Sequence, residues 1–257
     1  MSIKNQSVNS EVIPYNMPPQ VLFLTKSYFE ELAGLKQVLI NQKTSCIDCL
    51  CPILIPNKYE VLNPNTNNKL YELQEFSNFC ERFCFYRCRG FKMIINNFVN
   101  SINNISVILE GRKACTGGII ECFGCGKPKI LVDVKTPQGF VLGKIAMNWK
   151  SCCCPACTSR IDIIDNAGIL KYVIKANCFS IGTHCYFITK CCDILYHIKQ
   201  NKEKVGKIEK ISCDSCRICI TKADQFCIYF PPNATPEEKM LLIIGAILID
   251  YQSFYLC

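Results

Sequence analysis

The pattern of hydrophobic and polar positions changes along this chain. Between residues 36 and 230, apolar and polar side chains alternate in short runs that are rich in β-branched and aromatic residues and end at turn-forming residues. Such alternation is typical of β-strands. It predicts twelve strands, at Lys36–Asn41, Lys58–Asn63, Leu70–Glu75, Phe91–Ile95, Ile105–Glu110, Lys129–Val134, Val141–Met147, Arg160–Ile164, Leu170–Lys175, Asp193–Lys199, Val205–Lys210 and Phe226–Phe230.

The spacing of these strands indicates repeated hairpins. Turn-forming segments join five pairs of strands, and the hairpins start 31 to 38 residues apart, as in repeated supersecondary units. The first and last strands are each half of a hairpin, and if these halves pair, the sheet closes and has no exposed edge. The alternative is a sandwich of two sheets with a helix outside.

One segment near the C-terminus, residues 235–255, has the pattern of a helix. Thr235, Pro236 and Glu238 form a capping box with proline at the first helical position. A run of ten residues without a polar side chain follows, so protein or lipid must surround the helix. A membrane span needs roughly 20 apolar residues, so we expect a buried core helix, with membrane insertion as the alternative. The run comprises Met240, Leu241, Leu242, Ile243, Ile244, Gly245, Ala246, Ile247, Leu248 and Ile249.

These patterns predict a mainly β fold, a closed twelve-stranded antiparallel barrel of repeated hairpins around a C-terminal hydrophobic helix. We expect residues 1–20 to be a disordered polar tail and residues 21–257 to form the barrel domain, with residues 235–255 as its central helix. Within this domain, residues 21–33 are a short amphipathic segment, either a helix or a docking strip.

Composition adds a basic charge and an unusual number of thiols. The chain of 257 residues carries a net charge of +8, which favours acidic partners or reflects a solvated basic surface. It contains 22 cysteines and begins without the features of a signal peptide, so we expect the thiols to stay reduced.

The cysteines follow the same period as the hairpins. Their clusters all fall between hairpins, and in an up-and-down barrel these connections lie at one end. We therefore expect nearly all thiols at that end. The clusters are Cys46/Cys49/Cys51, Cys80/Cys84/Cys88, Cys115/Cys122/Cys125, Cys152/Cys153/Cys154/Cys157, Cys178/Cys185/Cys191/Cys192 and Cys213/Cys216/Cys219.

Three interpretations of these clusters remain open. Pairs of cysteines with two residues between them, such as Cys122 and Cys125, could supply zinc ligands. Exposed cysteines with basic or apolar neighbours suit thioacylation near a membrane, and the run WKSCCCPAC from Trp149 to Cys157 has that character. Buried inert thiols explain single cysteines but not the periodic clustering.

Catalytic motifs give no support for hydrolysis or nucleotide use. The sequence GCGKP at Gly124–Pro128 lacks the first glycine and the Ser/Thr of a phosphate-binding loop. His197 lies in a predicted strand, where a structural role is expected rather than that of a base. No order of serine, histidine and aspartate, pair of acids or dinucleotide fingerprint stands out.

With strands and cysteines placed, the chain resembles the phospholipid scramblase family, whose fold is shared with tubby-like proteins. The resemblance runs from about Pro18 to Tyr255 and is most specific in its last two segments. The matching segments are PPQVLFLT at Pro18–Thr25, NKYEVLN at Asn57–Asn63, RGFKMII at Arg89–Ile95, GFVLGKIAMNW at Gly139–Trp149, VGKIEK at Val205–Lys210, ADQFCIYFPP at Ala223–Pro232 and the following MLLIIGAILIDY.

This resemblance implies a barrel around a central helix, attachment through palmitoylated cysteines, and calcium as a cofactor. The family's calcium segment corresponds to Lys222–Asn233, where Asp224 is kept, but a lysine replaces the first acidic ligand and Asn233 stands at the last. A lysine opposes calcium, so we expect binding to be weak. The family's acylated segment aligns with Cys115, Cys122 and Cys125, whereas the CCCP pattern occurs at Cys152, Cys153, Cys154 and Cys157.

The expected function is ATP-independent, bidirectional movement of phospholipids between leaflets, by a protein on the cytoplasmic face of the plasma membrane. Expected partners are phospholipid membranes and anionic lipids, without nucleic acid. One alternative is a non-catalytic, membrane-anchored lipid-binding module, and another is a cysteine-rich zinc-binding protein.

Overall fold

The structure is a computed structural model that describes residues 29–43, 56–76, 91–98, 107–112, 130–135, 141–149, 159–176, 194–211 and 225–254. Its elements are a short 3-10 helix, twelve strands and one α-helix. They are η1 (Glu30–Leu32), β1 (Gln37–Lys43), β2 (Lys58–Leu62), β3 (Lys69–Glu75), β4 (Phe91–Asn97), β5 (Val107–Arg112), β6 (Ile130–Lys135), β7 (Val141–Trp149), β8 (Ser159–Asp165), β9 (Leu170–Ala176), β10 (Ile194–Gln200), β11 (Glu203–Ile211), β12 (Gln225–Tyr229) and α7 (Pro236–Phe254).

The twelve strands form a closed antiparallel barrel. Each strand pairs with its neighbours in the chain, and β1 pairs with both β2 and β12, so the sheet has no free edge. The closing register places Gln37 opposite Tyr229 and Asn41 opposite Gln225. The predicted barrel is therefore confirmed and the sandwich is excluded, because both half-hairpins pair with each other.

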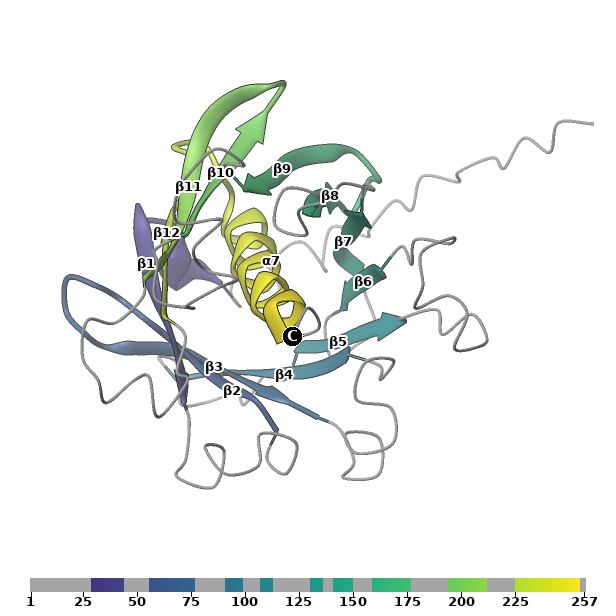
Figure 1. Cartoon of the computed structure of the whole chain (residues 1–257). Coiled ribbons are helices and arrows are strands. Elements are labelled where there is room, and N and C mark those ends of the chain that lie inside the picture. The colour runs from purple at the N-terminus through teal and green to yellow at the C-terminus, as the bar shows by residue number, and fades with distance from the viewer. Residues whose placement is uncertain are drawn as a thin grey trace, which may run out of the picture.

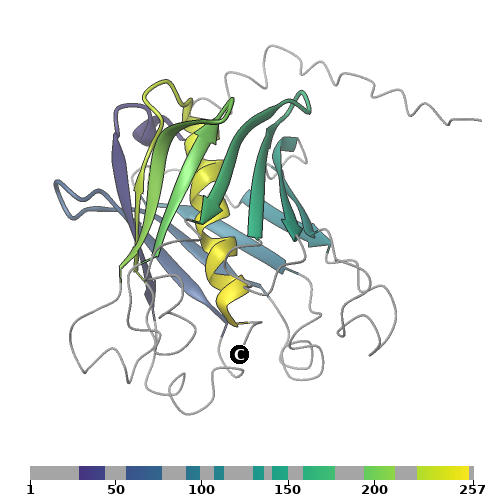
Figure 2. The same ribbon diagram turned by 45° about the horizontal axis from the view of Figure 1, so that its top comes forward.

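Helix α7 runs lengthwise through the barrel, ringed by strands (Figures 1 and 2). The predicted capping box starts it: the Thr235 amide donates to Glu238 Oε2 at 3.1 Å, and the Glu238 amide donates to Thr235 Oγ1 at 3.3 Å. Every residue from Lys239 to Asp250 is buried. The apolar run from Met240 to Ile249 is thus the core of the barrel in this structure, where no polar face is needed.

Alternation along the strands supplies the inner wall that faces the helix. In β1 buried and partly exposed residues alternate, with Val38 and Ile40 fully buried. Glycine allows the closest contacts: a Cβ at Gly143 would lie 2.6 Å from Leu241 Cδ1, and one at Gly245 would lie 2.9 Å from Ile174 Cδ1. Substitution of either glycine would therefore force neighbouring side chains to move.

The two ends of the barrel differ. The tight turns of β2–β3, β8–β9 and β10–β11 lie at the end where α7 begins, which we call the turn end (Figure 2). Left-handed backbone at Asn67, Gly168, Asn201 and Lys202 forms these turns. At the opposite end, the register pairs Lys43 with Lys58, Trp149 with Ser159 and Ile211 with Gln225.

Several predictions concern residues outside the described part of the chain. The predicted tail at residues 1–20 lies there, as does most of the amphipathic segment at residues 21–33. Of that segment, Phe29 and Leu32 are buried and Glu30–Leu32 form η1. Every predicted cysteine cluster also lies outside the described residues.

Within the described residues, none of the helices combines the length and the apolar character that a membrane span requires.

Candidate functional site

A cavity of about 340 Å³ opens at the turn end, beside the first turn of α7. Four parts of the chain form it: the start of β9, the β10–β11 hairpin, the connection from β12 to α7 and the first turn of α7. Its wall contains an ammonium group, a carboxylate, two amides, a phenol and two prolines. The lining residues are Lys171, Tyr172, Gln200, Val205, Pro231, Pro232, Asn233, Thr235 and Glu238.

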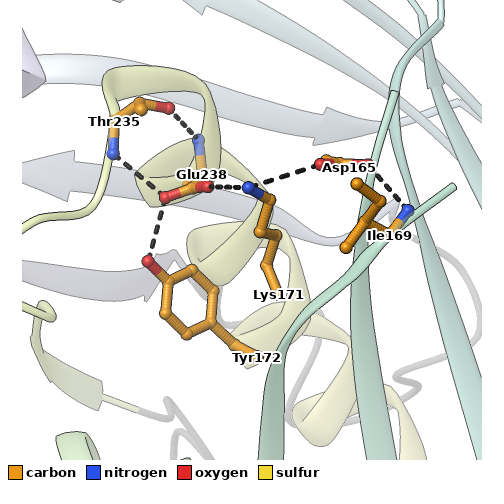
Figure 3. Close-up of polar contacts among 6 residues, drawn as sticks. All are labelled: Asp165, Ile169, Lys171, Tyr172, Thr235 and Glu238. Atoms are coloured by element: carbon orange, nitrogen blue, oxygen red, sulfur yellow. Dashed lines mark hydrogen bonds and ion pairs between the residues drawn. The ribbon is translucent and has the colours of Figure 1, made fainter. Parts of the chain in front are cut away.

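Glu238 is the centre of a polar network in this wall (Figure 3). Besides the Thr235 amide, its carboxylate accepts a hydrogen bond from the Tyr172 hydroxyl at 2.9 Å. Lys171 Nζ lies 3.7 Å from Glu238 Oε1 and 3.5 Å from Asp165 Oδ2. The network thus ties the start of α7 to β9 and to the β8–β9 turn, and burial together with the Glu238 carboxylate raises the pKa of Tyr172.

The wall of the cavity carries both charges and neutral polar groups. Lys171 offers a cation with one third of its side chain exposed. Glu238 offers an anion, and the amides of Gln200 and Asn233 offer both donors and acceptors. These donors, acceptors and paired charges could hold a small polar group in the cavity.

The predicted calcium segment is divided by β12. Asn233 is exposed in the cavity wall, whereas Asp224 lies outside the described residues and directly precedes β12 in the chain. The five residues of β12 rise by about 3.3 Å each, so its two ends lie roughly 13 Å apart. Across the described part of the chain, no group of three or more His, Cys, Asp or Glu residues is arranged to hold a metal ion. The calcium and zinc assignments therefore stay predictions.

A second polar cluster holds the other end of α7 inside the barrel. Asp250, on the last turns of the helix, is completely buried, and Tyr59 on β2 donates its hydroxyl to Asp250 Oδ2 at 2.7 Å. Lys210 on β11 is also buried and places Nζ 3.4 Å from Asp250 Oδ1. The buried carboxylate of Asp250 is thus held by a hydroxyl group from β2 and an ammonium group from β11, so it is not left unpaired in the core.

A third contact fixes the start of α7 to η1. Lys239 is buried, and its ammonium group donates to the carbonyl oxygens of Leu32 at 2.8 Å and of Ala33 and Leu35 at 2.9 Å each. All three ammonium hydrogens therefore have an acceptor. Burial lowers the pKa of Lys239 from its usual 10.5.

Sequence reasoning did not assign these polar contacts. Lys239, Lys210 and Tyr59 carry no motif, because their partners lie 40 to 207 positions away in the chain. Asp250 was visible as the residue that ends the apolar run, and a charge at that place is a signal for a buried partner. Glu238 was predicted as a cap, and its contacts with Tyr172 and Lys171 depend on the fold.

The lipidation candidates lie outside the described residues, so they too remain predictions: Cys115, Cys122, Cys125, Cys152, Cys153, Cys154 and Cys157. Cys227 is described and buried on β12, and burial raises the pKa of its thiol. A buried thiol with a raised pKa is unreactive, so Cys227 is a structural cysteine.

The chain is similar in sequence to a family of known proteins. The Scramblase family model matches residues 16–255. Among curated proteins, the chain is 26% identical over 243 residues to mouse Phospholipid scramblase 1 and 27% identical over 248 residues to the human protein of that name, covering 94% of this chain in both cases. It is 24% identical over 258 residues to human Phospholipid scramblase 2.

The match spans 65% of the mouse protein, 67% of its human counterpart and 78% of human Phospholipid scramblase 2. No solved structure matches the chain significantly. Since the family model covers nearly the whole sequence, including all twelve strands and α7, the chain belongs to the scramblase family.

Proposed function

We propose that this protein moves phospholipids between the two leaflets of a membrane, in both directions and without ATP. The observation that carries the proposal is the family match over residues 16–255, which includes the whole barrel and its central helix. The lack of a nucleotide-binding motif in the sequence supports independence from ATP. We place the protein on the cytoplasmic face of the plasma membrane.

The position of α7 sets a physical condition on this activity. A headgroup must cross about 30 Å of hydrocarbon, and a helix enclosed by twelve strands offers it no path across. Either α7 leaves the barrel and enters the bilayer, or one face of the barrel thins the bilayer locally. If the barrel thins the bilayer, the polar cavity beside α7, with its paired cation and anion, suits a zwitterionic or amine-bearing headgroup.

The enclosed helix also favours a second function, a non-catalytic lipid-binding module that is anchored to the membrane. Such a module needs the cavity and a membrane tether but no path across the bilayer. The two functions differ in one measurable property, the rate at which labelled lipid changes leaflet.

The test is a lipid-translocation assay with purified full-length protein in proteoliposomes. Fluorescent phospholipid in both leaflets is bleached by an impermeant reductant, with and without calcium. Scrambling predicts faster and more complete bleaching than in empty vesicles. If bleaching matches that of empty vesicles at every calcium level while the protein remains bound to lipid, the lipid-binding module replaces our proposal.

We further propose that the membrane tether is a set of acylated cysteines. One acyl chain gives marginal, reversible binding, so stable attachment needs a second chain or a basic patch. The cluster from Cys152 to Cys157 offers several chains, with Lys144 and Lys150 before it and Arg160 after it to meet anionic headgroups. Serine substitution of the four cysteines in this cluster should release much of the protein from membranes.

Zinc is the competing role for these thiols, and one preparation can decide between the two. Acyl-exchange labelling detects thioesters, and metal analysis of the same purified protein detects zinc. Thioester without zinc supports the acylated tether. Zinc in a near-integer ratio to protein, without thioester, contradicts it. If thioester is found without zinc, adding Cys122→Ser and Cys125→Ser to the variant with four serines should increase its release from membranes.

A further inference from the structure

A row of basic side chains crosses the outer surface of β8 to β11. Buried and partly exposed residues alternate in β9 and β10, which puts Lys175, His197 and Lys199 on the outer face. The register places Lys175 opposite both Arg160 and His197, and His197 opposite Lys207. Basic residues from four consecutive strands are therefore direct neighbours.

A second pair extends the row toward the turn end. Lys199 lies directly opposite Lys204, next to a register shift between β10 and β11. Residues opposite each other in antiparallel strands have Cβ atoms about 5 Å apart, and like charges at that separation are destabilising. We call Lys175, His197, Lys199 and Lys204 the basic patch.

The members of the basic patch are not neutralised by neighbouring acids. At the edge of the row, Arg160 is paired with Asp162 and Lys207 with Glu209, each at 2.6 Å. Within the described part of the chain, by contrast, the three lysines of the patch form no ion pair. Burial, together with the positive charges of Lys204 and Lys199, lowers the pKa of His197.

Exposed apolar side chains stand next to the patch. Ile169 and Leu170, in the β8–β9 turn and at the start of β9, are 58% and 47% exposed. Val173 pairs with Lys199, so Leu170 lies three residues, roughly 10 Å, beyond that lysine along β9. Lysines beside exposed aliphatic residues match the layers of a bilayer surface, with anionic headgroups outside and hydrocarbon beneath.

We propose that this side of the barrel docks onto a membrane surface that contains anionic phospholipids, through the basic patch and the apolar pair Ile169 and Leu170. The proposal rests on the proposed function for its membrane setting and goes beyond it in naming the contacting wall. The barrel then lies on its side against the bilayer. A nucleic acid would also be attracted by the lysines, but the apolar pair gives it no contact.

Cosedimentation of full-length protein with vesicles tests the docking surface. The vesicles contain phosphatidylcholine alone or phosphatidylcholine with phosphatidylserine. The test variant carries Lys175→Gln, Lys199→Gln and Lys204→Gln. Each lysine near an anionic leaflet contributes about a fivefold gain in binding, so the triple variant should bind the anionic vesicles on the order of 100-fold more weakly.

A matched control variant removes the same amount of positive charge from another side of the barrel. Lys43, Lys58 and Lys69 lie on β1 to β3 and are held in ion pairs with Glu60 and Glu72. Their replacement by glutamine changes the net charge equally, so any effect of net charge alone appears in both triple variants. Binding by the control triple should stay within about threefold of the unmodified protein, because these lysines are already paired.

The outcomes separate the docking surface from the proposed function. Equal binding of both triple variants to anionic vesicles overturns the docking proposal, as does a test triple that loses binding to single-stranded nucleic acid but not to vesicles. Replacing Ile169 and Leu170 by serine should weaken vesicle binding without changing its salt dependence. Docking is measured without lipid movement, so a protein that docks normally but does not accelerate translocation contradicts the proposed function and leaves this surface intact.

Discussion

Replacing Lys239 by methionine tests how α7 is held at its entry to the barrel. Methionine keeps the length and apolar packing of the side chain but removes the three donors to Leu32, Ala33 and Leu35. The Leu32 oxygen still accepts the Leu35 amide at 3.2 Å, so the loss falls mainly on two carbonyls. At about 1.5 kcal/mol for each, we expect the free energy of unfolding to fall by about 3 kcal/mol.

The measurement is urea unfolding followed by circular dichroism under reducing conditions, with the m-value checked for constancy. A loss of about 3 kcal/mol corresponds to a melting temperature roughly 6–12 °C lower for a domain of this size. Lys171→Met is the control at the same end of the barrel, the turn end. Its ion pairs are long, at 3.5 and 3.7 Å, and we expect a change below about 0.5 kcal/mol.

The pH dependence provides an independent check. The pKa of Lys239 is lowered in the folded protein, so between that value and 10.5 the unfolded chain binds more protons than the folded one. The stability of the unmodified protein relative to Lys239→Met should therefore rise as the pH increases through this window. A loss below about 1 kcal/mol at neutral pH, with no trend at alkaline pH, would refute the reasoning, because it would mean that desolvation of the ammonium cancels its hydrogen bonds.

Three further predictions concern the helix and calcium. Ile244 is fully buried, so Ile244→Lys leaves an unpaired charge in the core and should give insoluble protein. Ile244→Val should lower the free energy of unfolding by only about 0.5–1.5 kcal/mol. A soluble, folded lysine variant would contradict a core position for Ile244. Tyr59→Phe removes the 2.7 Å hydrogen bond to Asp250 and should lower the free energy of unfolding in urea by about 1.5–3 kcal/mol. An unchanged midpoint of urea unfolding would show that this hydrogen bond does not stabilise the fold. Calorimetry should find calcium bound no tighter than about millimolar, and a micromolar site that Asp224→Ala abolishes would disprove this.

Much of the architecture could be predicted because it is encoded locally. Alternation identified all twelve strands, and most boundaries shifted by one or two residues, as for Lys36–Asn41, which is Gln37–Lys43 in the structure. The capping box at Thr235 located the first turn of α7. Closure of the barrel could be predicted because the first and last strands each lacked a hairpin partner, and these two strands, β1 and β12, pair with each other.

The polar contacts could not be predicted in the same way, since they depend on register between distant segments. Lys175, His197 and Lys207 become neighbours only once three strands are aligned. A slip by one residue would turn His197 to the inside of the barrel. The sequence also gave no sign that Lys239 would bind backbone carbonyls more than 200 positions earlier, because a lysine at the start of a helix is usually solvated.

The order of the elements along the chain has a consequence for biosynthesis. Among the described elements of the barrel, the strand that closes it, β12, and the helix that fills it, α7, leave the ribosome last. Until they appear, β1 and β11 present open edges and the inner wall has no partner for its apolar side chains. A nascent chain in that state is prone to aggregation, so we expect it to depend on chaperones until synthesis is complete. A premature stop codon even shortly before residue 236 would therefore remove the whole fold and not merely one helix.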